Sequence, residues 1–235
     1  DIFGKIEDIN NLDINAILYN ANDAKEKLRN TTLDMMAGNT SISSGNITNN
    51  LESINSIMQD YSSVNNSAEM MQSTINNLNS LKEEYDKSED NTYKESIKIQ
   101  MENLYNVLVR LSGDISTSLS SVTEEKQQMI LDNDSSRELK ILGMDLGSNN
   151  RMINSQLKKI SVSNNEELNS EEVNNEYYNT LENQTNMQNQ IQPGESVVDN
   201  PILSLETTIN QLSGKIDSSE IEQMQELVQN IGVSA

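Results

Sequence analysis

The sequence predicts an all-α protein: an elongated bundle of three long helices, with a short N-terminal amphipathic helix and a C-terminal helical hairpin. Apolar residues recur at steps of three and four over most of the 235 residues, which is the spacing of one helix face. Both of the 2 prolines follow Gln192, so the strongest helix breaker is absent from the long patterns. Hydrophobic residues make up 34% and aromatic residues 3% of the chain, which favours thin aliphatic seams over a thick core.

Residues 1–38 form an N-terminal amphipathic segment. Their apolar residues lie mostly three or four apart, which predicts one short helix, or two with an Asn-rich break, docked on the rest of the chain. These residues are Ile2, Phe3, Ile6, Ile9, Leu12, Ile14, Ile17 and Leu18. The polar stretch 39–50, with Gly45 inside it, predicts a loop.

Residues 46–162 form the predicted bundle of long helices. The first pattern runs from Ile47 to Tyr85 with heptad-like spacing, which corresponds to a helix on the order of 55–60 Å long. The second runs from Tyr93 to Met129 and is expected to pair antiparallel with the first. The third continues from Leu139 to Ile160.

Two capping boxes are predicted at the starts of the second and third long helices. Thr92 with Glu95, and Ser135 with Glu138, have the Ser/Thr-x-x-Glu spacing in which a side chain satisfies a free backbone amide.

Glycines and methionines on the predicted seams each allow two interpretations. Gly143 and Gly147 lie four apart and could permit a close helix contact, but we favour a weakened or kinked helix because glycine costs helix stability. Six of the 11 methionines fall on the apolar stripes, where filling the core is favoured over adaptable partner contact. They are Met58, Met71, Met101, Met129, Met152 and Met224.

The C-terminal part divides into a polar connector and a hairpin. Residues 163–200 are dominated by Asn, Glu and Gln, with sparse apolar anchors such as Val173 and Tyr177, and predict either a marginal helix or a mobile segment. Turn signals at Pro193-Gly194 and Asn200-Pro201 precede residues 201–235, whose two short apolar stripes predict a helical hairpin for docking on another subunit.

The charge of the chain excludes several classes of partner. Sixteen Lys and Arg against 37 Asp and Glu give a formal charge of −21, which repels nucleic-acid phosphates and anionic lipids. No apolar run approaches the roughly 18–20 residues of a membrane span, so we expect neither nucleic acid nor a direct span. The chain begins at Asp1, so a removed leader or a fragment is expected.

No catalytic, cofactor or metal site is predicted. The chain has no Cys and no His, which removes the thiolate nucleophile, the usual activating base and the usual zinc ligands. Adjacent carboxylates such as Glu171-Glu172 point about 100° apart on a helix and indicate a solvated face. The segment starting at Asp132 is similar to a calcium loop but has Arg137 at the sixth position and Gly143 at the twelfth, so helix capping explains it better.

A non-enzymatic role in assembly or adhesion therefore remains. Seams rich in Asn and Ser bury little apolar area, so we expect other protein subunits, and homo-oligomerisation, to complete the core. The expected partner contacts lie on the two ends of the chain: Ile2, Phe3, Ile6, Ile9, Leu205, Ile209, Leu212, Met224, Leu227 and Val228.

Two stretches resemble a known family. EDINNLDINAIL (7–18) and RELKILGMDLGSNNRMINSQLKKI (137–160) are similar to exported pilus-tip or minor-pilin proteins of conjugative type IV secretion systems. The resemblance implies a protein of the bacterial periplasm or cell surface, assembled at the tip of a secretion or conjugation pilus and contacting pilin or secretion-channel subunits. Two alternatives stay open: a phage or virion structural or scaffolding protein, located in the virion or the cytoplasm, and a type III tip, translocator or flagellin-like filament protein.

Overall fold

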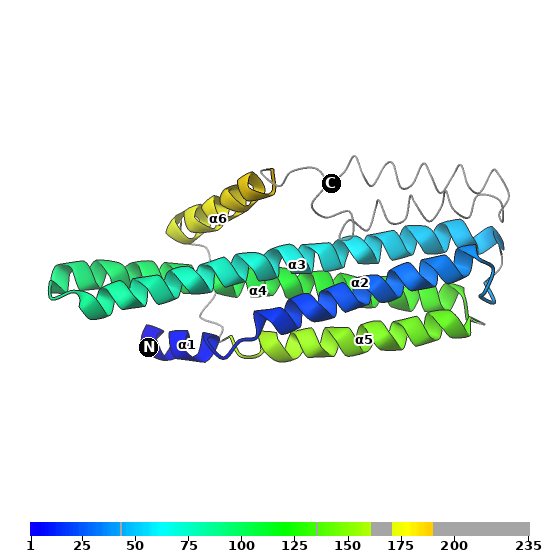
Figure 1. The fold of residues 1–235 in the computed structure, drawn as a ribbon, viewed down its shortest axis with the longest axis horizontal. Coiled ribbons are helices and arrows are strands. Elements are labelled where there is room, and N and C mark those ends of the chain that lie inside the picture. Colours follow the sequence, from blue (N-terminus) through cyan, green and yellow to red (C-terminus); the bar gives the residue numbers. More distant parts are fainter. Residues whose placement is uncertain (43, 135, 161–170, 190–235) are drawn as a thin grey trace. The chain divides into compact units, whose positions relative to one another are not determined.

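The computed structural model describes residues 1–42, 44–134, 136–160 and 171–189 (Figure 1). These ranges contain six helices and no strand, which confirms the predicted all-α bundle. The helices are α1 (Ile2–Ile9), α2 (Ile14–Met36), α3 (Ser44–Lys87), α4 (Asn91–Asp132), α5 (Arg137–Leu157) and α6 (Glu171–Asn189).

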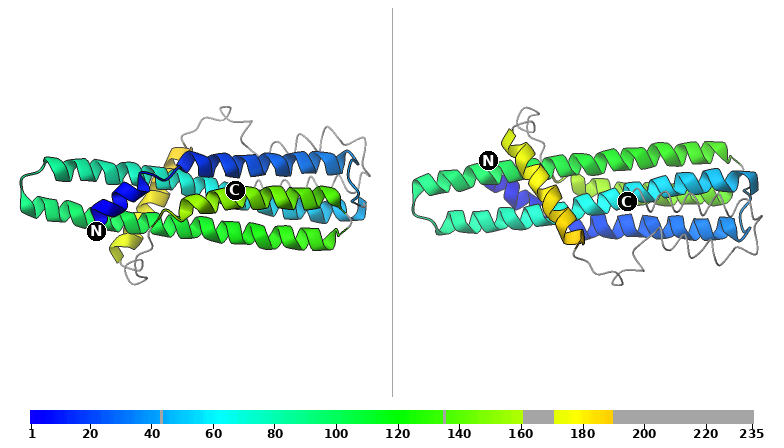
Figure 2. Two further views of the ribbon diagram at one scale, coloured as in Figure 1. Left: turned by 90° about the horizontal axis from the view of Figure 1, so that it is seen from below. Right: turned by 90° about the horizontal axis from the view of Figure 1, so that it is seen from above.

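The described chain forms two compact units, to both of which α3 and α4 contribute. Unit 1 draws on Asp1–Tyr19, Ser63–Ser118 and, among the described residues, 151–160 and 171–189, and unit 2 draws on Asn20–Ser62 and Leu119–Asn150. This division differs from the segments 1–38 and 46–162, because each long helix packs against different neighbours along its length. Figure 2 shows α3 and α4 side by side.

The two long helices confirm the heptad-like patterns, since α3 has 44 residues and α4 has 42. The predicted loop at 39–50 is wrong in its second half, because α3 already begins at Ser44. Ile47 and Leu51 are buried there, and that burial outweighs the modest helix propensity of the surrounding Ser and Asn. The loop proper follows Gly38, whose φ of 73° ends α2 in the left-handed conformation that glycine adopts easily.

In the described residues, Asp90 caps α4 and Ser136 caps α5. Asp90 Oδ1 accepts hydrogen bonds from the backbone N–H groups of Thr92 (3.0 Å) and Tyr93 (3.5 Å). The capping box at Thr92 is therefore wrong, because the residue two positions earlier already satisfies these amides. At α5, Ser136 Oγ accepts from the Leu139 N–H at 3.3 Å, while Ser135 lies outside the described residues.

The α4–α5 contact in unit 2 supports the less favoured interpretation of Gly143. A Cβ at this position would meet the terminal Cδ1 atom of the Ile130 side chain, which would have to shift to another position. Lys126 Nζ also donates to the Gly143 carbonyl oxygen at 3.0 Å. Gly143 thus permits a close helix contact.

Four of the six stripe methionines fill the core as predicted: Met58, Met71, Met101 and Met129. Met152 is 53% exposed, so its placement in the core is wrong: it lies on the outer face of α5, whereas Ile153 beside it is buried. Met224 lies outside the described residues, as does the whole predicted hairpin 201–235.

The interior of each unit is aliphatic, with few large aromatic side chains. In unit 1, Met71, Leu78 and Leu108 are fully buried, and in unit 2 Ile54 and Leu146 are. Across the described ranges, no helix combines the length and the apolarity that crossing a membrane requires.

Candidate protein-interaction groove

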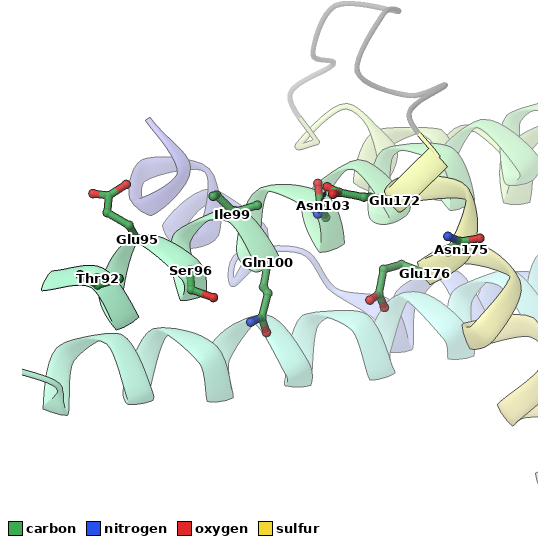
Figure 3. Close-up of a pocket in the computed structure, with 9 residues that line it drawn as sticks. All are labelled: Thr92, Glu95, Ser96, Ile99, Gln100, Asn103, Glu172, Asn175 and Glu176. Atoms are coloured by element: carbon green, nitrogen blue, oxygen red, sulfur yellow. Dashed lines mark hydrogen bonds between the residues drawn. The ribbon is translucent and has the colours of Figure 1, made fainter. Parts of the chain in front are cut away.

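An open groove of about 570 Å³ lies between α4 and α6 in unit 1 (Figure 3). It is lined by Thr92, Glu95, Ser96, Ile99, Gln100 and Asn103 of α4 and by Glu172, Asn175 and Glu176 of α6. We call it the α4–α6 groove.

Helical periodicity explains why these residues share one surface. The lining residues of each helix are separated by steps of three and one, which places them on a single face over about three turns of α4 and about one turn of α6. Beside them on α4, Ile97 and Met101 are buried. The same helix therefore directs apolar side chains into unit 1 and presents polar ones to the groove.

The residues that line the groove are mostly polar and include three acidic ones, while the carbon atoms of their side chains supply much of the surface. Glu95, Glu172 and Glu176 supply three carboxylates, and none of the lining residues is basic. Ile99 is the one apolar residue of the lining, and its side chain is 53% exposed. A cationic group entering the groove would thus meet carboxylate and amide oxygens, beside a small apolar contact.

Polar contacts to α4 hold α6 in place. Tyr177 donates its hydroxyl hydrogen to Asp114 Oδ2 at 2.7 Å. Arg110 Nη1 donates to Asn174 Oδ1 at 2.6 Å, and the guanidinium lies 5.0 Å from the centre of the Tyr177 ring. Val173 adds a buried apolar side chain. Two of the apolar anchors expected in this polar region, Val173 and Tyr177, therefore pack against other parts of unit 1.

One further hydrogen bond lies at the groove itself. Asn103 Nδ2 donates to Glu172 Oε2 at 3.3 Å across an exposed surface. The two helices are thus joined at the groove wall, where water competes for the same groups.

Burial, followed by the hydrogen bond to Asp114 and its charge, raises the pKa of Tyr177 to about 12. The phenol is therefore neutral at physiological pH and remains the donor in this contact. One of the contacts that dock α6 thus depends on a phenolic proton.

The expected partner-contact residues occupy different positions. Ile2, Ile6 and Ile9 are buried within unit 1, and the Phe3 ring lies 4.9 Å from the Tyr85 ring. Burial by their own chain argues against a partner at these side chains, although their role in assembly stays a prediction. Leu205, Ile209, Leu212, Met224, Leu227 and Val228 lie outside the described residues.

Sequence reasoning missed the groove because its residues belong to two segments far apart in the chain. Glu171-Glu172 was interpreted as a solvated face, and both side chains are exposed. Nothing in the spacing within α6 indicates that α4 supplies the opposite wall.

The groove chemistry suits recognition. Its hydroxyl, amide and carboxylate groups bind through hydrogen bonds and charge. Within residues 1–42, 44–134, 136–160 and 171–189, no cluster of three or more carboxylates is arranged to hold a metal ion.

No protein-family model, curated protein or solved structure matches this chain.

Proposed function

We propose that the protein is a non-enzymatic assembly component that binds a basic segment of a partner protein in the α4–α6 groove. The observation that carries this proposal is the groove lining, which has three carboxylates, no cation and one exposed isoleucine. A formal charge of −21 over the chain would further attract a cationic partner and raise the association rate.

The charged and apolar groups of the groove suggest which residues the partner segment contains. Carboxylates on both walls favour Lys or Arg side chains that reach to both helices. The exposed Ile99 favours one apolar residue between them, since covering it removes apolar area from water. We therefore expect a short segment with basic residues on either side of a leucine, isoleucine or methionine.

A peptide-binding measurement tests the groove. The probe is a labelled helical peptide with Lys at i and i+4 around one Leu, compared with the same peptide carrying Glu in place of Lys. We expect fluorescence anisotropy to detect binding of the Lys peptide alone. Affinity should fall by about tenfold or more in a Glu95→Lys/Glu176→Lys variant, since a charge-assisted contact contributes roughly 1.5–3 kcal/mol.

The matched control is Glu26→Lys/Glu52→Lys, which changes the net charge equally at exposed positions of unit 2. It should retain most of the affinity. Equal loss in both variants would mean that net charge alone attracts the peptide, and absence of Lys-peptide binding would remove the groove as a basic-segment site.

The finer proposal is that the assembly is the tip of a secretion or conjugation pilus. It rests on the similarity of residues 7–18 and 137–160 to pilus-tip proteins. Quantifying the protein in purified pili of the source bacterium tests this point, with light scattering of the isolated chain to give its oligomeric state. A tip protein should co-purify at a few copies per pilus, whereas its presence along the whole filament would favour a flagellin-like subunit, and its presence in virions a phage protein.

A further inference from the structure

Two carboxyl groups meet between α3 and α4 in unit 2, well apart in sequence from the groove residues. Glu125 of α4 lies within hydrogen-bonding reach of Asp60 on α3. Ser56 donates its hydroxyl hydrogen to Glu125 Oε1 at 2.6 Å. The Ser121 hydroxyl lies 3.5 Å from the same oxygen and is also within hydrogen-bonding reach of Asp60. We call Asp60 and Glu125 the carboxyl pair.

The second oxygen of each carboxyl group is left without a donor. Asp60 Oδ2 and Glu125 Oε2 are inaccessible to solvent and have no hydrogen-bond partner among the described residues. Ionised carboxylates can only accept hydrogen bonds, so two of them cannot satisfy each other. One proton on either group supplies a donor and removes the repulsion at the same time.

Two cationic side chains of α4 and α2 are engaged with other groups, and no cation, including Arg29 of α2, whose Nε atom is buried, is among the groups that shift the pKa of Asp60. Lys126, next to Glu125 on α4, donates to the Gly143 carbonyl oxygen of α5. On α2, Lys27 pairs with Asp23 at 2.7 Å. The Tyr61 hydroxyl, beside Asp60 in sequence, donates to Asn150 Oδ1 of α5 at 2.7 Å. A proton is thus the simplest way to complete the carboxyl pair.

We propose that the carboxyl pair is a pH-sensitive contact that tightens the packing of α3 on α4 when the surroundings become mildly acidic. Asp60 gains the proton, and its carboxyl group then donates to the carboxylate of Glu125. Above this range both groups are ionised and repel each other, and one buried oxygen of each stays without a donor, so the two helices separate locally more often.

The electrostatics set the pH range and its direction. Burial, followed by the charge of Glu125, raises the pKa of Asp60 from 3.8 to about 6. The folded protein therefore retains a proton that the unfolded chain has already released. The stabilisation is fully present below about pH 3.8 and is lost as the pH rises through about 6.

Carboxyl-carbon NMR titration of the full chain tests the pair directly and needs no variant. We expect one Asp carboxyl to titrate near pH 6, in agreement with the raised pKa of Asp60, and its signal to disappear in Asp60→Asn. Titration of Asp60 near 3.8, the ordinary value for Asp, would overturn the proposal.

Amide hydrogen exchange then tests the consequence for packing. Protection factors are compared at about pH 5 and about pH 7.5, on either side of the Asp60 pKa. In the wild type, amides of α3 and α4 near the pair should be several-fold more protected at the lower pH. Asp60→Asn, whose amide donates at every pH, should abolish this difference, and Glu125→Gln should do the same from the opposite helix.

Glu52→Gln is the matched control, because it removes an exposed carboxylate from the same helix. This variant should keep the wild-type difference in amide protection between the two pH values. A difference that persists in both Asp60→Asn and Glu125→Gln, or that vanishes equally in Glu52→Gln, would assign the pH response to overall charge and overturn the proposal.

Discussion

Helices α1 and α6 both dock in unit 1, but by different chemistry. The eight residues of α1 bury three isoleucines, Ile2, Ile6 and Ile9. The 19-residue α6 buries Val173 and otherwise relies on hydrogen bonds from Arg110 and Tyr177. A short helix can therefore be held firmly by apolar contacts, while a longer one is held by contacts that depend on geometry and protonation.

The difference matters because the two kinds of contact respond to different conditions. Burying an isoleucine contributes roughly 1.5–3 kcal/mol and is insensitive to pH. A hydrogen bond contributes about 0.5–1.5 kcal/mol net and can be replaced by water. We infer that α1 leaves unit 1 only when the unit unfolds, whereas α6 can leave while the rest of the unit stays folded.

The largest effect is expected from Ile6→Asp. Ile6 is completely buried, so the variant places a charge in an apolar site and should lower the free energy of unfolding by roughly 3–5 kcal/mol. Urea denaturation, monitored by circular dichroism, measures this change. Gly4→Asp is the control, because a Cβ there meets nothing within 4 Å. A small loss in Ile6→Asp would show that α1 docks as weakly as α6.

The next effect is expected from Val173→Asp. Replacing the buried Val173 with a charged residue should weaken the docking of α6 by about 1–3 kcal/mol and so release it. The free energy of global unfolding should change little. Because the chain has no native Cys, labels at Glu102→Cys and Glu182→Cys can report the α4–α6 distance by energy transfer. Asn179→Asp, at an exposed position, should leave the distance unchanged. Loss of global stability instead would mean that α6 belongs to the cooperative core.

Tyr177→Phe should weaken docking by about 1 kcal/mol, since it removes the 2.7 Å hydrogen bond to Asp114. The same contact has a pH dependence. Because the folded pKa of about 12 exceeds the ordinary value of 10, the contribution is complete below about pH 10 and is lost as the pH rises towards 12. In the labelled chain, the α4–α6 distance should increase over that pH range as α6 is released. In Tyr177→Phe, the part of this increase that follows ionisation of the phenol should be absent. An unchanged profile would rule out the phenol as the group responsible.

The smallest effect is expected from Asn103→Ala. Its hydrogen bond to Glu172 is 3.3 Å long and exposed, so the docking free energy should change by at most about 0.5 kcal/mol. The label distance should remain that of the wild type. A loss as large as that of Tyr177→Phe would show that the groove wall, rather than the Arg110–Tyr177 contacts, holds α6.

Periodicity predicted the helices well because it is a local property of the chain. The apolar spacing from Ile47 to Tyr85 and from Tyr93 to Met129 corresponds to α3 and α4 within a few residues. It failed at 39–50, where the burial of Ile47 extends α3 through a polar stretch. It also failed at Met152, whose steps of six from Leu146 and one to Ile153 depart from three and four. Ile153, seven residues after Leu146, is the residue that stays on the buried face.

The sequence by itself determined the all-α class, the long helices and their acidic surface, because these follow from residue spacing and composition. Tertiary structure alone decided that Gly143 permits a close helix contact, that Asp60 meets Glu125, and that α6 lies beside α4 to form a groove. Each of these features joins residues of two helices. Their meeting depends on how whole helix faces pack, which no local pattern contains.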